Sequence, residues 1–299
     1  MTPGLRKLKL FGELVKYEHT VFNLPFAYLG AFLAADGWPR WPQLFWITVA
    51  MAGARTAAMG LNRLFDAEID RKTPRTAGRH IPAGLIGRGE VWAYVALALA
   101  ALLLAAGKLH PLALRLFPLA VLTFAVYPFT KRFTWLCHVW LGLSVSWGAF
   151  GAFVAVSGRV TPQILLLVGA ITLWNAGFDV IYGTQDLEAD RVNGVHSIPA
   201  RFGLSRALRI ARLLHLGVVA LTLLLGTATG LLPVATPLHW PVSAWIYLVG
   251  WALVAGLLHY EHSIISPRDM SRVDAAFFNV NGYLSVAFAL CAAAAVVLH

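Results

Sequence analysis

Half of the acidic residues of this chain fall in two short clusters within otherwise apolar segments. The sequence has 299 residues, is 59% hydrophobic and holds 14 Asp and Glu residues. Seven of these form the two clusters: Asp66, Glu68, Asp70, Asp179, Asp186, Glu188 and Asp190. Because a charge at the centre of a membrane helix costs about 2.5–3.5 kcal/mol on insertion scales, each cluster needs a positive partner. A divalent cation is the leading candidate.

Within each cluster the polar side chains repeat at helical spacing. Asn62, Asp66 and Asp70 are four residues apart, so they share one face of a helix. A second stripe, spaced by three or four residues, consists of Asn175, Asp179, Tyr182, Asp186 and Asp190. Carboxylate and amide oxygens suit Mg²⁺, which keeps waters and shares its shell with substrate phosphates. Two acidic faces in one cavity therefore predict a bound diphosphate bridged by Mg²⁺. The alternative is that the acids only cap a solvated helix end. Acids at the C-terminal end of a helix would oppose its dipole, which argues against that alternative.

Basic residues follow the first stripe and recur in a second loop. Arg75 and Arg79 lie soon after the first cluster, and Lys131 and Arg132 lie about 60 residues further on. Arg and Lys pair with phosphate oxygens, so we predict that these four residues bind the diphosphate. Charge that only sets the membrane topology is the alternative for each of them.

One arginine lies deeper on the face of the first stripe. Arg55 is seven residues before that stripe begins, and an intramembrane arginine is a functional candidate by default. Arg55 is therefore a candidate for binding an anionic group of the substrate; pairing of Arg55 with Glu18 or a helix carbonyl is the alternative. Lys16 and His19 are further polar residues near the start of the first expected helix.

Long apolar helices must position these groups. Mean hydropathy is +0.68 and only 13% of the residues are charged. Leu, Ala, Val and Phe runs of about 20 residues each suit one bilayer crossing. We predict an all-α fold: one domain, residues 1–299, forming a polytopic membrane bundle of nine transmembrane helices around a central cavity. The expected helices cover residues 10–35, 42–70, 88–107, 111–130, 134–157, 162–190, 204–230, 241–261 and 275–297.

Positive charge alternates between the predicted loops. Seventeen of the 24 Lys and Arg residues fall at the N-terminus and in every second loop, and four fall in the remaining loops. The positive-inside rule then places the N-terminus in the cytoplasm. We expect a bacterial-type cytoplasmic (inner) membrane with the site open to the cytoplasm. The absence of a separate basic domain argues against nucleic acid as a partner, and two lone cysteines, Cys137 and Cys291, indicate buried thiols rather than disulfides or zinc.

The two clusters also share a short pattern. The sequence D-x-E-x-D-R occurs from Asp66 to Arg71 and again from Asp186 to Arg191, at an offset of 120 residues. Two related half-sites that face each other are the simplest interpretation. Chance similarity between two membrane-edge clusters is the alternative.

The two stripes resemble the paired motifs of the UbiA superfamily of intramembrane aromatic prenyltransferases. The first reads N-x-x-x-D-x-x-x-D from Asn62, and the second reads D-x-x-Y-x-x-x-D-x-x-x-D from Asp179. The segments 74–79 (PRTAGR) and 127–132 (YPFTKR) fit the same resemblance. The 4-hydroxybenzoate polyprenyltransferase group is the most similar, and residues 16–26 resemble a UbiA-like branch linked to menaquinone biosynthesis. The resemblance implies transfer of a polyprenyl group from polyprenyl diphosphate to an aromatic hydroxy acid of the 4-hydroxybenzoate type, within the lipid bilayer, in quinone biosynthesis.

The resemblance also implies roles for individual residues. Asn62, Asp66 and Asp70 would hold one Mg²⁺, and Asp186 with Asp190 would hold a second, the two being bridged by the diphosphate. Asp179 and Tyr182, the predicted catalytic residues, would lie deeper, near the reacting carbon. Arg55 and Asn175 would bind the aromatic acceptor, with Arg55 at its carboxylate. Lys16, Glu18 and His19 would help to shape the acceptor pocket.

Electrophilic attack on an aromatic ring would use Asp179 and Tyr182 differently. The ring of Tyr182 could stabilise an allylic cation by about 0.5–2 kcal/mol, and Asp179 could remove the ring proton. A membrane-interface tyrosine is the alternative for Tyr182, and Asp179 could instead hold the phenol or a metal-bound water. A dihydroxynaphthoate is an alternative acceptor. Haem farnesyltransferases and chlorophyll synthases are alternative enzymes that share the metal chemistry. A cation or metabolite transporter is the alternative from another class of protein.

Overall fold

The structure is a computed structural model that describes residues 10–15, 20–233 and 237–299. Within these ranges it is helical and contains no strand, apart from an isolated bridge between Ser266 and Asp269. The long helices are α2 (Thr20–Ala35), α3 (Trp41–Lys72), α4 (Arg88–Leu109), α5 (Pro111–Thr130), α6 (Cys137–Ser157), α7 (Pro162–Gly183), α10 (Leu204–Ala228), α11 (Val242–Ser263) and α13 (Asn281–Val297).

Short helical segments connect or extend these long helices. They are η2 (Thr184–Asp186), α8 (Leu187–Val192), α9 (Ile198–Phe202), η3 (Pro237–His239), α12 (Val273–Ala275) and the π-helical η4 (Ala276–Val280). The expected helix over 162–190 is therefore an α-helix only as far as Gly183, because a 3-10 turn follows before α8. The expected helix over 10–35 corresponds to helical residues 10–15 and α2, with 16–19 outside the described residues.

Among the described residues, seven helices are long and apolar enough to cross a membrane, when α7 is counted with its extension to Val192. Two shorter apolar helices, Asn23–Ala35 and Asn281–Val297, complete the bundle. The prediction of an all-α membrane bundle is confirmed. Nine crossings and a cytoplasmic N-terminus stay predictions.

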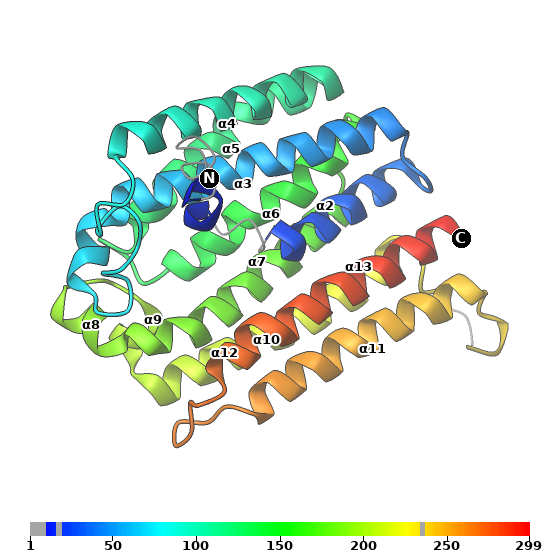
Figure 1. Ribbon diagram of the computed structural model, residues 1–299. Coiled ribbons are helices and arrows are strands. Elements are labelled where there is room, and N and C mark those ends of the chain that lie inside the picture. The colour runs from blue at the N-terminus through cyan, green and yellow to red at the C-terminus, as the bar shows by residue number, and fades with distance from the viewer. Residues whose placement is uncertain (1–9, 16–19, 234–236) are drawn as a thin grey trace.

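The long helices lie side by side, and the loop after α3 lies at the same end of the bundle as α8 and α9, on the left in Figure 1. Helix α3 has 32 residues, which corresponds to a length of about 48 Å, whereas the hydrocarbon core of a bilayer is about 30 Å thick. Its acidic stripe occupies the last turns. The length of α3 therefore carries that stripe to one edge of the bundle, next to the segment after α7.

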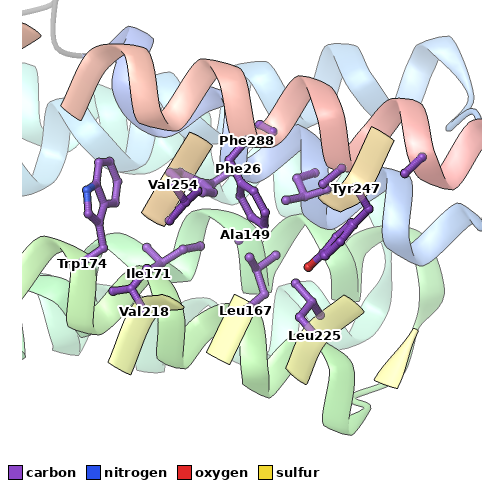
Figure 2. Close-up of a cluster of buried hydrophobic side chains, with 14 of the residues drawn as sticks. Phe26, Ala149, Leu167, Ile171, Trp174, Val218, Leu225, Tyr247, Val254 and Phe288 are labelled. Atoms are coloured by element: carbon purple, nitrogen blue, oxygen red, sulfur yellow. The ribbon is translucent and has the colours of Figure 1, made fainter. Parts of the chain in front are cut away.

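The largest apolar core joins α2, α6, α7, α10, α11 and α13, as Figure 2 shows. Trp174 and Tyr247 are each 1% exposed, and each satisfies its polar atom. The indole of Trp174 donates to Asn281 at 2.6 Å and the hydroxyl of Tyr247 donates to the carbonyl of Thr222 at 2.6 Å. Because Trp174 also lines the central cavity, this core supports one wall of the site.

Glycines bring α6 into backbone contact with its neighbours. A Cβ atom on Gly142 of α6 would lie 2.1 Å from the carbonyl oxygen of Thr172 on α7, and one on Gly30 of α2 would lie 2.3 Å from that of Ala149 on α6. Close approach through small residues is typical of membrane helices, which associate by van der Waals packing. Helix α6 is therefore fixed between α2 and α7.

Candidate active site

The loop after α3 folds across to the second acidic cluster. Arg75 donates from Nε to Oδ1 of Asp186 at 2.8 Å and makes a second, shorter contact from Nη2 to Oδ2. It also donates from Nη1 to the Tyr182 hydroxyl at 3.0 Å. The hydrogen bond and attraction of Asp186 raise the pKa of the Arg75 guanidinium above its usual value. This forked contact joins two segments more than 100 residues apart and confirms that the two clusters meet at one place.

The first cluster has cationic partners as well. Lys131 donates to Oδ2 of Asp66 at 2.6 Å, and Arg79 donates to Oδ1 of Asp70 at 2.6 Å. Asn62 donates to the same Oδ2 of Asp66 at 2.7 Å. The side chains of Asp66 and Asp70 are only 1% and 5% exposed. Three of the four predicted diphosphate-binding cations thus neutralise three of the predicted metal ligands.

Each buried carboxylate of the first cluster keeps one oxygen without a partner. Oδ1 of Asp66 and Oδ2 of Asp70 are buried and have no hydrogen-bond partner among the described residues. Unmet buried acceptors are costly, at about 1–3 kcal/mol each, and hard oxygen donors suit Mg²⁺. The donors of Asn62, Asp66 and Asp70 therefore fit a bound Mg²⁺. The described residues hold no cluster of three or more His, Cys, Asp or Glu side chains placed for a metal, so such an ion would need oxygens from water or substrate to complete its shell.

The second cluster is arranged differently. The spacing predicts one α-helix for Asp179, Tyr182, Asp186 and Asp190, but a 3-10 turn at Thr184–Asp186 separates α7 from α8. Tyr182 and Asp186 nevertheless contact the same Arg75 guanidinium. Both oxygens of Asp186 contact Arg75, and Oδ2 of Asp190 accepts from the Ser197 hydroxyl at 2.8 Å. A metal ion at Asp186 would have to displace Arg75.

A cavity of about 770 Å³ lies inside the bundle, next to these pairs. Its polar lining includes Arg55, Asn175, Asp179, Tyr182 and Asn62. Most of the remaining wall is apolar and comes from α3 to α7. The volume suits a ligand of several rings or isoprene units, since small-molecule sites commonly enclose about 300–1,000 Å³.

The two predicted acceptor-binding residues both line this cavity, but their hydrogen bonding differs. Arg55 has a buried Nε without a hydrogen-bond partner among the described residues. Asn175 is 2% exposed and donates to the carbonyl of Ile171 at 2.8 Å. The alternative partner Glu18, like Lys16 and His19, lies outside the described residues.

Arg132 contacts the backbone rather than an acid. Its Nη2 donates to the carbonyl of Phe65 at 2.6 Å, and its guanidinium carbon lies 5.0 Å from the ring centre of Phe129. Arg75 and Arg79 line the cavity, whereas Lys131 and Arg132 are not among its lining residues. Diphosphate binding stays a prediction for all four.

Sequence reasoning missed several partners of the site. His138 of α6 lies with Nδ1 2.7 Å from Oδ2 of Asp179, and His80 pairs with Glu13 at 3.5 Å in the cavity wall. These residues carry no repeat or motif that links them. A lone histidine in an apolar segment, such as His138, was the available signal, but its partner is 41 positions away.

Comparison with known proteins assigns the chain to one family. The model of the UbiA prenyltransferase family matches residues 23–297. A 4-hydroxybenzoate octaprenyltransferase of Cupriavidus necator is 31% identical over 290 residues, which cover 95% of this chain and 96% of that protein. The chain therefore belongs to the UbiA prenyltransferase family, and it is an integral membrane enzyme, a prenyltransferase.

Solved structures agree with this assignment. The apo structure of a UbiA homolog from Aeropyrum pernix K1 is 33% identical and superposes with a TM-score of 0.80, covering 92% of this chain and 96% of that one. A UbiA homolog from Archaeoglobus fulgidus bound to DMAPP and Mg²⁺ is 18% identical, has a TM-score of 0.71, and covers 97% and 99% of the two chains. The second likeness shows the shared fold.

Proposed function

We propose that this enzyme transfers a polyprenyl group from polyprenyl diphosphate to an aromatic hydroxy acid of the 4-hydroxybenzoate type and releases diphosphate. The observation that carries the proposal is the meeting of three acid–cation pairs at a largely apolar internal cavity. A diphosphate headgroup needs both metal ligands and cations, and a prenyl chain needs an apolar space. The name of the Cupriavidus necator relative supports the same reaction.

Asn62, Asp66 and Asp70 are the residues that would hold Mg²⁺ first, because two of their buried oxygens are unmet. When bound, Mg²⁺ stabilises the negative charge that grows on the diphosphate as the carbon–oxygen bond breaks. Asp186 and Asp190 are the proposed ligands of a second ion. The Mg²⁺ found with DMAPP in the Archaeoglobus fulgidus homolog is consistent with this assignment.

The cations would exchange partners when substrate enters. In the structure Arg75, Arg79 and Lys131 neutralise carboxylates, which removes the cost of isolated charge at the membrane edge. If those carboxylates held Mg²⁺, the side chains of Arg75, Arg79 and Lys131 would be free to pair with diphosphate oxygens. They would then act on the leaving group as fixed positive charge, which stabilises the transition state.

Inside the cavity, the acceptor would be held with its acid end at Arg55. The partly buried Arg55 has a buried Nε without a partner among the described residues, and this matches a carboxylate, which accepts two parallel hydrogen bonds from arginine. Tyr182 and Asp179 line the same cavity, and the Tyr182 ring can contact an allylic cation. The apolar wall excludes water, which would otherwise trap that cation.

The membrane orientation is proposed from charge. Four arginines, Arg201, Arg206, Arg209 and Arg212, are exposed on and next to the first turns of α10, close to the α8–α9 end of the bundle in Figure 1. The positive-inside rule therefore places this end, and with it the mouth of the site, in the cytoplasm of a bacterial-type inner membrane. A cysteine introduced at position 206 should not react with a membrane-impermeant thiol reagent in intact cells.

The function is tested with membranes, radiolabelled polyprenyl diphosphate, Mg²⁺ and a panel of acceptors. We expect a prenylated product with 4-hydroxybenzoate, its loss with EDTA, and its return with excess Mg²⁺. Product with a dihydroxynaphthoate alone would move the acceptor to the menaquinone type. For Arg55, the acid is compared with its carboxamide: Arg55→Ala should weaken binding of the acid and leave the carboxamide unaffected, and no change in this preference would contradict the assignment.

A further inference from the structure

His138 is a buried histidine that the reaction described above does not use. It lies in the first turn of α6, is 4% exposed, and contacts two other elements. Nδ1 lies 2.7 Å from Oδ2 of Asp179 on α7, and Nε2 lies 3.3 Å from the backbone nitrogen of Ile198, the first residue of α9. The ring therefore spans the space between a cavity-lining carboxylate and a backbone amide.

These two contacts fix the tautomer of the imidazole. A backbone N–H can only donate, so Nε2 must accept with its lone pair. In a neutral imidazole whose Nε2 is an acceptor, Nδ1 carries the proton. The Nδ1–H group therefore donates to Oδ2 of Asp179. The hydrogen bond holds one carboxylate oxygen and leaves Oδ1 to receive a proton from the cavity.

We propose that His138 is a positioning residue that holds Asp179 in the orientation needed to remove the ring proton of the aromatic acceptor. This inference rests on the prenyl transfer proposed above. After the ring carbon has bonded to the allylic carbon, the C–H bond at that ring carbon breaks. Its electron pair restores the aromatic ring and its proton passes to Asp179. His138 keeps its own Nδ1 proton throughout.

The position of His138 is itself tied to the charged end of the site. The segment that supplies the Ile198 amide is held by Ser197, which donates to Asp190 at 2.8 Å, and by His196, whose backbone nitrogen donates to the carbonyl of Lys131 at 2.7 Å. The orientation of the base is therefore set relative to the residues proposed to bind the diphosphate. This arrangement would place the ring proton and the departing group in a fixed relation, which is the purpose of a positioning contact.

The test removes the donor while keeping the volume. His138→Leu lacks the N–H group, and His138→Gln keeps an N–H donor and an acceptor. We expect His138→Leu to lower kcat by about 10–100-fold, part of the 10²–10⁴-fold that a placed general base supplies. The KM for polyprenyl diphosphate should not change, and His138→Gln should recover most of the lost kcat. His138→Met, which also lacks a donor, replaces the leucine variant if that protein does not fold.

A kinetic isotope effect separates positioning from a structural role. With an acceptor deuterated at the reacting ring carbon, the donor-less variants should show a larger primary isotope effect on kcat than the wild type, because proton removal becomes slow. The matched control is His215→Leu on α10, which removes another buried histidine, 2% exposed and paired with His262 at 3.0 Å. That change should lower thermal stability and leave the isotope effect unchanged.

A double-mutant comparison completes the test. If His138 acts through Asp179, His138→Leu should cause no further loss in the Asp179→Asn background. An isotope effect equal to that of the wild type in the donor-less variants, or full additivity with Asp179→Asn, would overturn the inference. Failure of the wild type itself to prenylate any aromatic acid would instead overturn the proposed function, so the two failures are distinguishable.

Discussion

The two acidic clusters share the pattern D-x-E-x-D-R, yet the structure treats them differently. The α3 cluster lies on a continuous helix, and its two aspartates are buried and keep one carboxylate oxygen each without a partner among the described residues. The second cluster is divided by the turn of η2, and both oxygens of Asp186 contact Arg75. The same sequence pattern therefore leaves unpartnered oxygens in an open half-site, the α3 cluster, and pairs Asp186 with a cation in a closed half-site, the second cluster.

If the proposed function holds, this difference gives the two half-sites separate tasks. The continuous helix holds Asn62, Asp66 and Asp70 in fixed register, which would suit a metal site. Asp186 contacts Arg75 and Asp190 contacts Ser197, so these carboxylates would hold a metal only after their present contacts rearranged.

The strongest way to break the comparison is to disable the open half-site. Asp66→Asn should lower turnover by about 10³-fold, because a Lewis-acid metal contributes several kcal/mol and each 1.4 kcal/mol is a factor of ten. Turnover is measured with labelled polyprenyl diphosphate at saturating Mg²⁺. The matched control is Glu68→Gln, because Glu68 is 61% exposed and pairs only with Arg71 and Arg88 in the described structure. This variant should keep wild-type turnover. Equal losses of turnover in Asp66→Asn and Glu68→Gln would contradict the proposed metal site.

Disabling the closed half-site should have the next largest effect. Asp186→Asn should lower turnover by about 10²-fold, since it removes one proposed metal ligand but also releases Arg75 to bind the diphosphate. The same assay with Glu188→Gln, an exposed neighbour whose side chain pairs with Arg191 at 3.3 Å, provides the control. A loss as large as that of Asp66→Asn would show that the half-sites are equivalent.

A third change sharpens the comparison without substrate. Arg75→Gln should free Asp186 to bind Mg²⁺. The Mg²⁺ concentration that raises the Tm of the detergent-solubilised variant should then be about threefold to tenfold lower than for the wild type. This factor corresponds to about 1 kcal/mol, the value of a partly exposed ion pair. Thermal unfolding is followed during titration with MgCl₂. Arg88→Gln, at an exposed pair 3.8 Å long, is the control, and an identical Mg²⁺ midpoint for Arg75→Gln and the wild type would argue against competition.

The smallest effect is expected at Arg132. Because its guanidinium binds the carbonyl of Phe65, Arg132→Gln should change the KM for polyprenyl diphosphate by less than about threefold and stability by about 1 kcal/mol, the usual value of one hydrogen bond. Initial rates against diphosphate concentration measure the first quantity. A tenfold rise in KM would place Arg132 with Arg75, Arg79 and Lys131.

Much of this arrangement can be predicted from sequence because membrane helices leave strong signals. The apolar runs predicted the long helices, and the three-to-four spacing placed Asn62, Asp66 and Asp70 on one face of α3, which the structure keeps as one helix. The same spacing did not reveal the 3-10 turn after Gly183, because the positions of polar residues carry no information about such a turn. Pairings such as Arg75 with Asp186 or His138 with Asp179 depend on how distant segments pack, and they were not readable from local pattern.

Gly142 makes the contact between α6 and α7 stiffer than the loop after α3. There is no space for even a methyl group between Gly142 and the backbone of α7, so the helix that carries His138 cannot slide past the helix that carries Asp179. In the loop that carries Arg75 and Arg79, by contrast, a Cβ atom on Gly78 would meet nothing within 4 Å. Helices α6 and α7 therefore hold the direction of the Asp179 carboxylate, whereas the loop after α3 has room to move. We expect substrates of different bulk to shift this loop before they shift Asp179.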